Sequence, residues 1–148
     1  MYSYAYALDA LNETVISNAF ISPCHFDISA LIGLPAKNLS GPEYYKVART
    51  NLGGFDATQH LLSNPLVTPT GPHEAHVKVY ISAFHGLVTD GKTEGATARV
   101  FWLLDLVSED EQWKIKGMKV QPIIPMDNLN VFKKGHERGE AGQFRKGV

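Results

Sequence analysis

The sequence predicts an α+β protein in which a curved antiparallel sheet packs on N-terminal helices and forms a cone-shaped α+β barrel. Helical patterns occupy roughly the first third of the chain, and strand patterns follow from residue 57 to residue 120. Because helices and strands are segregated rather than alternating, a parallel βαβ sheet is disfavoured. The interior of such a cone is a usual place for a small-molecule site.

The length and composition fit one globular domain. The chain has 148 residues, of which 44% are hydrophobic and 20% are charged, and its formal net charge is −1. This balance disfavours a nucleic-acid surface, which needs clustered lysine and arginine. No run approaches the roughly 20 apolar residues that span a bilayer, and the N-terminus has no secretory signature. We therefore expect a soluble cytoplasmic protein without nucleic-acid or membrane partners.

The first predicted helix covers residues 4–16. Its apolar residues recur at spacings of four, three and four, which places them on one face of a helix. They are Tyr4, Leu8, Leu11 and Val15. Pro23 is expected to end this helical region, and a short strand is expected over residues 24–30.

A second helix is predicted over residues 41–51. Ser40 can cap its first amides, and Glu43 stands three residues later, where a capping box places it. Pro42 suits the first turn of a helix. The glycines at positions 53 and 54 then end the helix.

Four strands are predicted after this helix, over residues 57–62, 75–88, 95–107 and 113–120. Prolines at positions 65, 69 and 72 are expected to end the first of them, because proline cannot donate to a sheet ladder. Asp90 and Gly91 predict a hairpin turn. Alternation along the second strand puts Val77, Val79, Ile81 and Ala83 on one face and Lys78, Tyr80, Ser82 and Phe84 on the other.

Residues 128–148 are predicted to lie outside a single domain formed by residues 1–127. The segment carries four glycines and few large apolar residues. Chain ends of this composition are poorly ordered unless something ties them down. We therefore expect a tail that is either mobile or docked on a partner.

Three segments resemble a known family. They are Phe55 to His60 with its Thr-Gln-His triplet, the strand His76 to His85, and the segment Trp113 to Lys119. Together they are similar to the SnoaL-like, scytalone dehydratase-like branch of the nuclear transport factor 2-like superfamily. The likeness covers roughly residues 4–125 and implies the same cone-shaped α+β fold.

The resemblance also implies catalytic residues. Asp9 and His60 correspond to a cavity-facing aspartate and histidine, and such a carboxylate would fix the tautomer of the imidazole and raise its basicity. The residues alone favour structural roles for both. His85 is in register with the apolar face of its strand and is either a third catalytic group or a strand end near solvent. Asp27 matches an acidic position of the family and is therefore predicted as a substrate-pocket residue, and a surface role for it stays open.

The cavity is expected to be apolar. Scytalone dehydratase-type enzymes use two tyrosines that correspond to Leu8 and Ile28 here, and their polar pair falls near Val100 and Trp102. Scytalone itself is therefore not the expected substrate. Pocket residues for a hydrophobic ring system, each equally able to serve as core, are Tyr80, Phe84, Phe101, Trp102 and Met118.

These features predict a cofactor-independent acid/base enzyme, a cyclase, isomerase or dehydratase acting on a hydrophobic polyketide- or terpenoid-derived intermediate of secondary metabolism. The alternative is a non-catalytic small-ligand-binding or dimerisation domain. A homodimer is expected, because the open sheet face often pairs with a second copy in this superfamily. No metal site is expected, because His73 and His76 do not have the His-Glu-x-x-His spacing.

Overall fold

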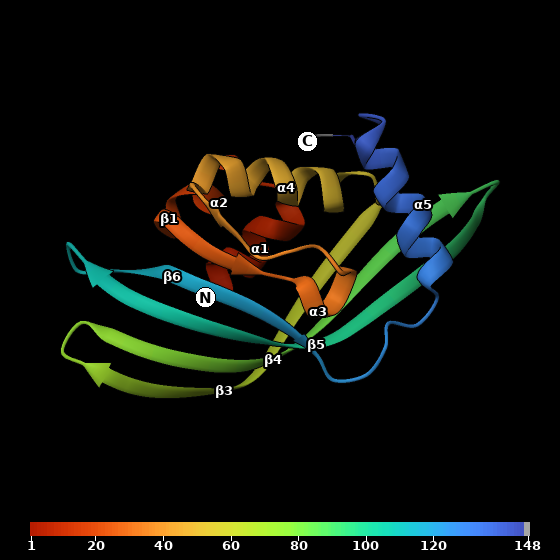
Figure 1. The fold of residues 1–148 in the computed structure, drawn as a ribbon. Coiled ribbons are helices and arrows are strands. Elements are labelled where there is room, and N and C mark those ends of the chain that lie inside the picture. The colour runs from red at the N-terminus through yellow and green to blue at the C-terminus, as the bar shows by residue number, and fades with distance from the viewer. Residues whose placement is uncertain (147–148) are drawn as a thin grey trace.

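One curved sheet wraps around the N-terminal helices in the computed structural model, which describes residues 1–146 (Figure 1). The elements are α1 (Tyr2–Ala10), α2 (Glu13–Asn18), β1 (Phe20–Asp27), α3 (Ser29–Ile32), β2 (Lys37–Leu39), α4 (Gly41–Gly53), β3 (Ala57–Gly71), β4 (Glu74–Thr89), β5 (Lys92–Glu109), β6 (Gln112–Pro122) and α5 (Leu129–Glu140). The strand order is β2-β1-β6-β5-β4-β3, with only the β1–β6 pair parallel among the described strands. The predicted α+β fold is confirmed, although the sheet stays open at β2 and β3 instead of closing into a barrel.

The single helix predicted over residues 4–16 is two helices in the structure. Leu11 adopts the left-handed conformation with φ of 48° and ends α1. The Asn12 side chain then accepts a hydrogen bond from the backbone N–H of Val15 at 3.1 Å and caps α2. Apolar spacing continues through this break, which is why the pattern alone suggested one helix.

Strand β1 begins earlier than predicted and includes Pro23. Its ladder with β6 is interrupted between Phe20 and His25, and its ladder with β2 begins only at Cys24. The missing N–H of Pro23 therefore falls where no ladder bond is needed. Residues 29 and 30, predicted as strand, belong to α3.

The capping box at the start of α4 is confirmed. The Glu43 carboxylate accepts a hydrogen bond from the backbone N–H of Ser40 at 2.8 Å, and the Ser40 hydroxyl accepts from the Glu43 N–H at 3.4 Å. Because these bonds satisfy amides that have no partner within the helix, they fix where α4 begins. The helix ends at Gly53, as predicted.

Strand β3 does not end at residue 62 but continues through Pro65 and Pro69. It is an edge strand, so a proline there can leave its missing donor on the solvent side. Its register with β4 shifts between residues 63 and 66 and again between residues 69 and 71. The prolines therefore bend the strand without ending it. The other three predicted strands are confirmed with slightly longer bounds.

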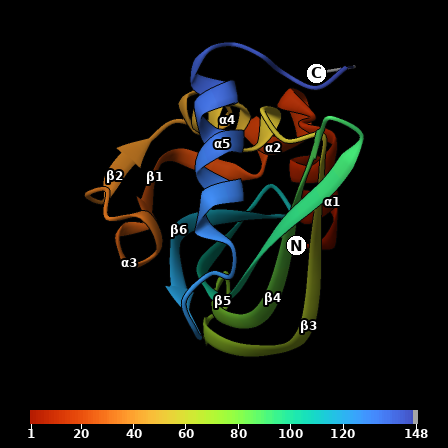
Figure 2. The same ribbon diagram turned by 90° about the vertical axis from the view of Figure 1, so that its right-hand side faces the viewer.

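The prediction of a mobile or partner-docked tail is wrong for residues 129–140, which form α5. This helix lies across one end of the sheet beside α4 (Figure 2). Val131 is 1% exposed and packs with Phe55. Two of the glycines that suggested flexibility are close contacts of α5: Gly139 lies against Thr50 of α4, and Gly135 lies against the ring of Phe55. Residues 147 and 148 lie outside the described residues. No helix among residues 1–146 is long and apolar enough to cross a membrane.

Substituting Gly139 with alanine is expected to lower the free energy of unfolding by about 1–3 kcal/mol, the usual cost of overpacking. A Cβ atom at this position would overlap the backbone carbonyl oxygen of Thr50, which cannot rotate away. Urea unfolding measures the change. Gly71→Ala is the matched control, because a Cβ there meets nothing within 4 Å. Equal stability of the two variants would contradict the tight packing of α5.

Candidate active site

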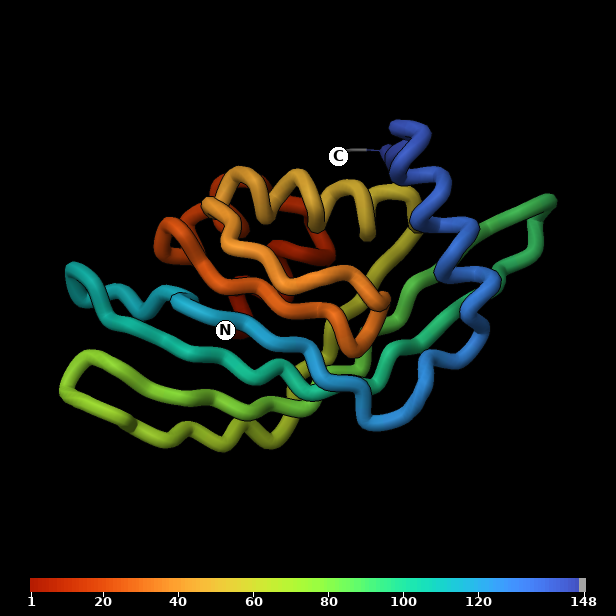
Figure 3. The backbone as a smooth tube through the Cα atoms, viewed as in Figure 1, coloured from red at the N-terminus to blue at the C-terminus, as the bar shows by residue number. Residues whose placement is uncertain are grey.

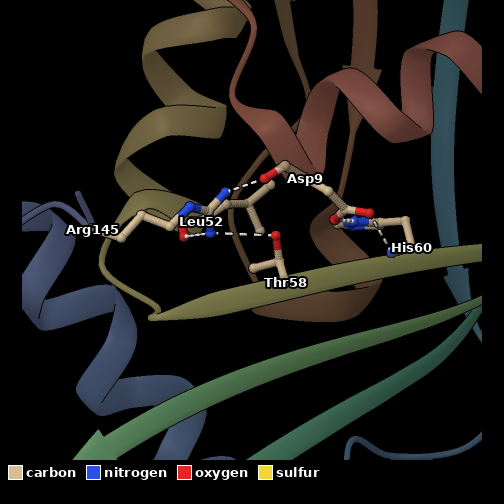
Figure 4. Close-up of polar contacts among 5 residues, drawn as sticks. All are labelled: Asp9, Leu52, Thr58, His60 and Arg145. Atoms are coloured by element: carbon tan, nitrogen blue, oxygen red, sulfur yellow. Dashed lines mark hydrogen bonds and ion pairs between the residues drawn. The ribbon is translucent and has the colours of Figure 1, made fainter. Parts of the chain in front are cut away.

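An aspartate from α1 and a histidine from β3 meet at the inner side of the sheet (Figure 4). Asp9 Oδ1 lies 2.7 Å from His60 Nδ1, and Asp9 Oδ2 accepts a hydrogen bond from the His60 backbone N–H at 2.8 Å. The His60 side chain is 7% exposed and the Asp9 side chain 22%. Because both carboxylate oxygens are engaged, the orientation of the carboxylate toward the imidazole is fixed.

The environment of Asp9 keeps this carboxylate charged. Burial raises the pKa of Asp9, but hydrogen bonds and positive charge from His60, with a hydrogen bond from the Thr58 hydroxyl, hold it below its ordinary value. A charged carboxylate accepts a hydrogen bond from Nδ1–H of the imidazole and thus selects the tautomer in which Nε2 carries the lone pair. His60 Nε2 is then available as a base.

Arg145 supports the pair from the C-terminal segment. Its Nη2 donates to the backbone carbonyl of Asp9 at the end of α1, and its Nη1 donates to the carbonyl of Leu52 at 3.3 Å and to Thr58 Oγ1 at 3.4 Å. A cation at the C-terminus of a helix also complements the helix dipole. One guanidinium thus connects the C-terminal segment with α1, α4 and β3, as Figure 4 shows.

A cavity of about 120 Å³ lies beside His60 between the helices and the sheet. Its wall is mostly apolar. Besides the indole N–H of Trp102, four side chains contribute polar atoms. They belong to Tyr44, Asn51, His60 and His85. At four positions, scytalone dehydratase-type enzymes have polar side chains that this chain is predicted to lack. All four line the cavity, and they are Leu8, Ile28, Val100 and Trp102. The Tyr44 hydroxyl is bonded to that of Tyr4 rather than free toward the cavity.

His85 lies in the same cavity as a second, differently tuned imidazole. Its ring centroid is 6.1 Å from that of His60, and the residue is 3% exposed. Burial, with repulsion from the charge of His60, lowers the pKa of His85 to about 4. His85 is therefore neutral near pH 7. Its buried Nδ1 has no hydrogen-bond partner within the described residues, so it can bind a polar group of a ligand.

The lowered pKa of His85 predicts that the protein becomes less stable in acid. Unfolded His85 has a pKa of 6.5 and folded His85 a pKa of about 4, so the unfolded state binds more protons between these values. The free energy of unfolding should fall as pH drops through this window, by up to about 3 kcal/mol. Urea unfolding across the window measures it, and His85→Gln should give a flatter curve. Identical curves for both proteins would contradict the prediction.

The structure divides the predicted pocket residues into two groups. Trp102 and Met118 line the cavity and are 4% and 3% exposed. The pocket assignment of Tyr80, Phe84 and Phe101 is corrected: they lie on the outer face of the sheet. Alternation along β4 and β5 turns these three side chains away from the cavity. The rings of Tyr80 and Phe101 pack on each other, with 4.5 Å between their centroids.

Asp27 does not line the cavity. Its Oδ1 accepts hydrogen bonds from the backbone N–H and the hydroxyl of Ser29, at 3.0 and 2.6 Å, and its Oδ2 lies 3.6 Å from the Lys119 amine. These contacts organise the turn between β1 and α3, which is a local structural role. Sequence reasoning missed Asn51 as a cavity residue, although the spacing of seven from Tyr44 puts both on one face of α4.

No group of three or more His, Cys, Asp or Glu side chains among residues 1–146 could hold a metal ion. The structure is an open α+β cone, and a histidine–aspartate pair lies on its inner wall. This fold defines a class of small proteins with an internal cavity. The family model for the SnoaL-like domain matches residues 1–119, and the chain belongs to this family. No curated protein matches its sequence.

Solved structures share this fold at low sequence identity. The Kfla4162 protein from Kribbella flavida has a TM-score of 0.81 at 20% identity, covering 89% of this chain and 90% of its own. A candidate scytalone dehydratase from Novosphingobium aromaticivorans has a TM-score of 0.70 at 21% identity, covering 84% and 79%. A hexachlorocyclohexane dehydrochlorinase from Novosphingobium barchaimii has a TM-score of 0.66 at 8% identity, covering 83% and 81%. The family model confirms the SnoaL-like resemblance inferred from the sequence, and these structures confirm the fold.

Proposed function

We propose that the protein is a cofactor-independent acid/base enzyme of the lyase or isomerase type that acts on a hydrophobic small molecule. The observation that carries the proposal is the Asp9–His60 pair, held by two hydrogen bonds at the wall of an apolar cavity. A charged carboxylate behind an imidazole stabilises the imidazolium that forms when the imidazole takes a proton. General acid/base catalysis by such a group contributes about 10²–10⁴-fold to a rate.

The proposed cycle begins when His60 Nε2 removes a proton from the substrate. The electron pair left behind either expels a leaving group, which completes an elimination such as a dehydration, or shifts within the carbon skeleton. The imidazolium of His60 then returns its proton to the leaving group or to another substrate atom. His85 is neutral and binds a polar atom of the substrate, and the apolar wall holds its rings in one orientation.

The family and the fold neighbours support this reaction class. The neighbours named as scytalone dehydratase and hexachlorocyclohexane dehydrochlorinase carry names that denote eliminations. Polyketide- and terpenoid-derived intermediates of secondary metabolism fit the apolar cavity because they are largely hydrocarbon rings with few polar groups. We propose such an intermediate as the natural substrate of cyclisation, dehydration or isomerisation.

The test uses 5-nitrobenzisoxazole, a small apolar carbon acid, with the wild-type protein. A base removes its ring C–H proton, the N–O bond breaks, and a coloured nitrile phenolate is released. We expect a saturable rate that exceeds the rate with an equal concentration of free imidazole, because a base positioned beside a bound substrate removes the proton faster. A rate no faster than that with free imidazole would leave a binding domain as the remaining interpretation.

The outer face of the sheet supports a second proposal, that two copies pair through it. Tyr80 is 45% and Phe84 38% exposed there, and the Lys78 amine lies 4.1 Å from the centre of the Phe101 ring. Exposed apolar patches of this kind mark association surfaces. Light scattering at micromolar concentration should give the mass of a dimer, and Tyr80→Glu should give a monomer. Tyr6→Glu, on the exposed side of α1, is the control; a monomeric wild-type protein would refute the pairing.

A further inference from the structure

The cavity beside His60 adjoins a second, larger one, and the two share part of their walls. This outer chamber has a volume of about 370 Å³ and lies between α3, α4 and the N-terminal half of α5. Five residues line both spaces and stand at their boundary, which we call the neck: Leu31, Ile32, Asn51, Met126 and Phe132. Figures 2 and 3 show α3 and α5 toward the same end of the molecule, separated by a gap. A ligand that reaches His60 through this neck passes through the outer chamber.

The volumes show that a ligand of several rings must occupy both chambers. A cavity of roughly 150 Å³ in another protein holds a single benzene molecule. The inner cavity, at about 120 Å³, therefore accommodates about one ring beside His60 and His85. The rest of a larger molecule extends past the neck into the outer chamber.

The outer chamber is the positively charged part of the site. Lys133 lines it and has no ion pair with the carboxylates of residues 1–146, whereas its neighbour Lys134 is paired with Glu94 at 3.2 Å. His136 also lines it, with its Nε2 paired to Glu140 at 3.4 Å, so Lys133 is the cation available to a ligand; no carboxylate side chain of residues 1–146 belongs to the wall of the chamber. At the neck, the Asn51 amide makes no hydrogen bond with the described residues and can donate to an acceptor there.

We propose that the protein binds amphipathic organic anions, with the apolar ring in the inner cavity and a carboxylate, or a similar oxyanion, in the outer chamber near Lys133 and Asn51. This inference rests on the proposed function, because it names the class of substrate for the same site. An apolar ring fits the inner wall, and the unpaired amine of Lys133 attracts the anion. Since Lys133 is exposed, its contribution to affinity is modest.

The experiment compares two fluorescent probes that share a naphthylamine ring system. 8-Anilinonaphthalene-1-sulfonate is an anion and N-phenyl-1-naphthylamine is neutral. We expect Lys133→Gln to weaken binding of the anionic probe about three- to five-fold, the size of one exposed ionic contact. Binding of the neutral probe should be unchanged, and the matched control Lys134→Gln should change neither. The Asn51 side-chain amide resonances should shift when the anionic probe binds.

The outcomes separate this inference from the catalytic one. Equal effects of Lys133→Gln on both probes, or an anionic probe that leaves the Asn51 resonances unmoved, would overturn the anion site and leave the acid/base proposal intact. If the selective loss is seen with Lys133→Gln while the wild-type protein fails to convert 5-nitrobenzisoxazole, the anion site stands and the catalytic proposal falls. Added salt should reduce the difference between the two probes, because the interaction lies near solvent.

Discussion

Replacement of His60 by alanine is expected to lower kcat/KM for 5-nitrobenzisoxazole by about 10²–10⁴-fold, the usual contribution of a positioned base. The protein should still fold, because the His60 side chain is at the cavity wall rather than interlocked in the main apolar cluster. Asp9→Asn should cause a similar loss. An asparagine oxygen carries no negative charge to stabilise the imidazolium, and its amide can favour the wrong tautomer of His60.

The double variant should be no less active than His60→Ala alone, because the two residues act as one unit. The structure offers a matched control in His76, which forms a second histidine–aspartate pair with Asp105 at 2.6 Å. That pair is exposed on the outer side of the sheet, and His76→Gln should leave the rate unchanged. Equal losses from His60→Ala and His76→Gln would show that the measured turnover does not occur in the cavity.

A local signal predicted the start of α4 correctly. The capping box at Ser40 involves residues three apart, so the sequence contains all of it. The break at Leu11 depends on a left-handed conformation of a non-glycine residue, which hydrophobic spacing does not encode. The continuation of β3 through Pro65 depends on its place at the sheet edge, and only the complete topology reveals that place.

The candidate site, too, combines features that the local sequence encodes with features that depend on the complete fold. Asp9 and His60 are 51 positions apart, and no pattern within the chain requires their contact; it was inferred from the family resemblance. Alternation along β4 places Tyr80 and Phe84 on the face of the strand that does not carry Val79. This alternation was correct, and the prediction of Tyr80 and Phe84 as pocket residues disagreed with it. The role of α5 was missed because two of its three buried residues, Gly135 and Gly139, are glycines, and Val131 is the third.

Arg145→Gln is expected to lower kcat about ten-fold with little change in KM, a smaller loss than the roughly 10²-fold cost of a 1 Å misplacement. The Arg145 guanidinium donates to the carbonyl at the end of α1, which carries Asp9, and also to the Thr58 hydroxyl, one of the groups that lower the pKa of Asp9. Glutamine cannot reach all of these acceptors with one amide. The loss of charged hydrogen bonds should also lower the free energy of unfolding by about 1.5–3 kcal/mol.

The variant Arg138→Gln is the control that distinguishes an effect on the position of Asp9 from an effect on protein stability. Arg138 donates two hydrogen bonds to the Asp56 carboxylate, at 3.1 and 3.2 Å, and links α5 to the start of β3 without contact to Asp9 or His60. Its loss should destabilise the protein while kcat stays near the wild-type value. In Arg145→Gln, by contrast, the NMR resonance of the His60 Nδ1 proton should move upfield as its hydrogen bond to Asp9 weakens. An unmoved resonance together with an unchanged kcat would restrict Arg145 to holding the C-terminal segment in place.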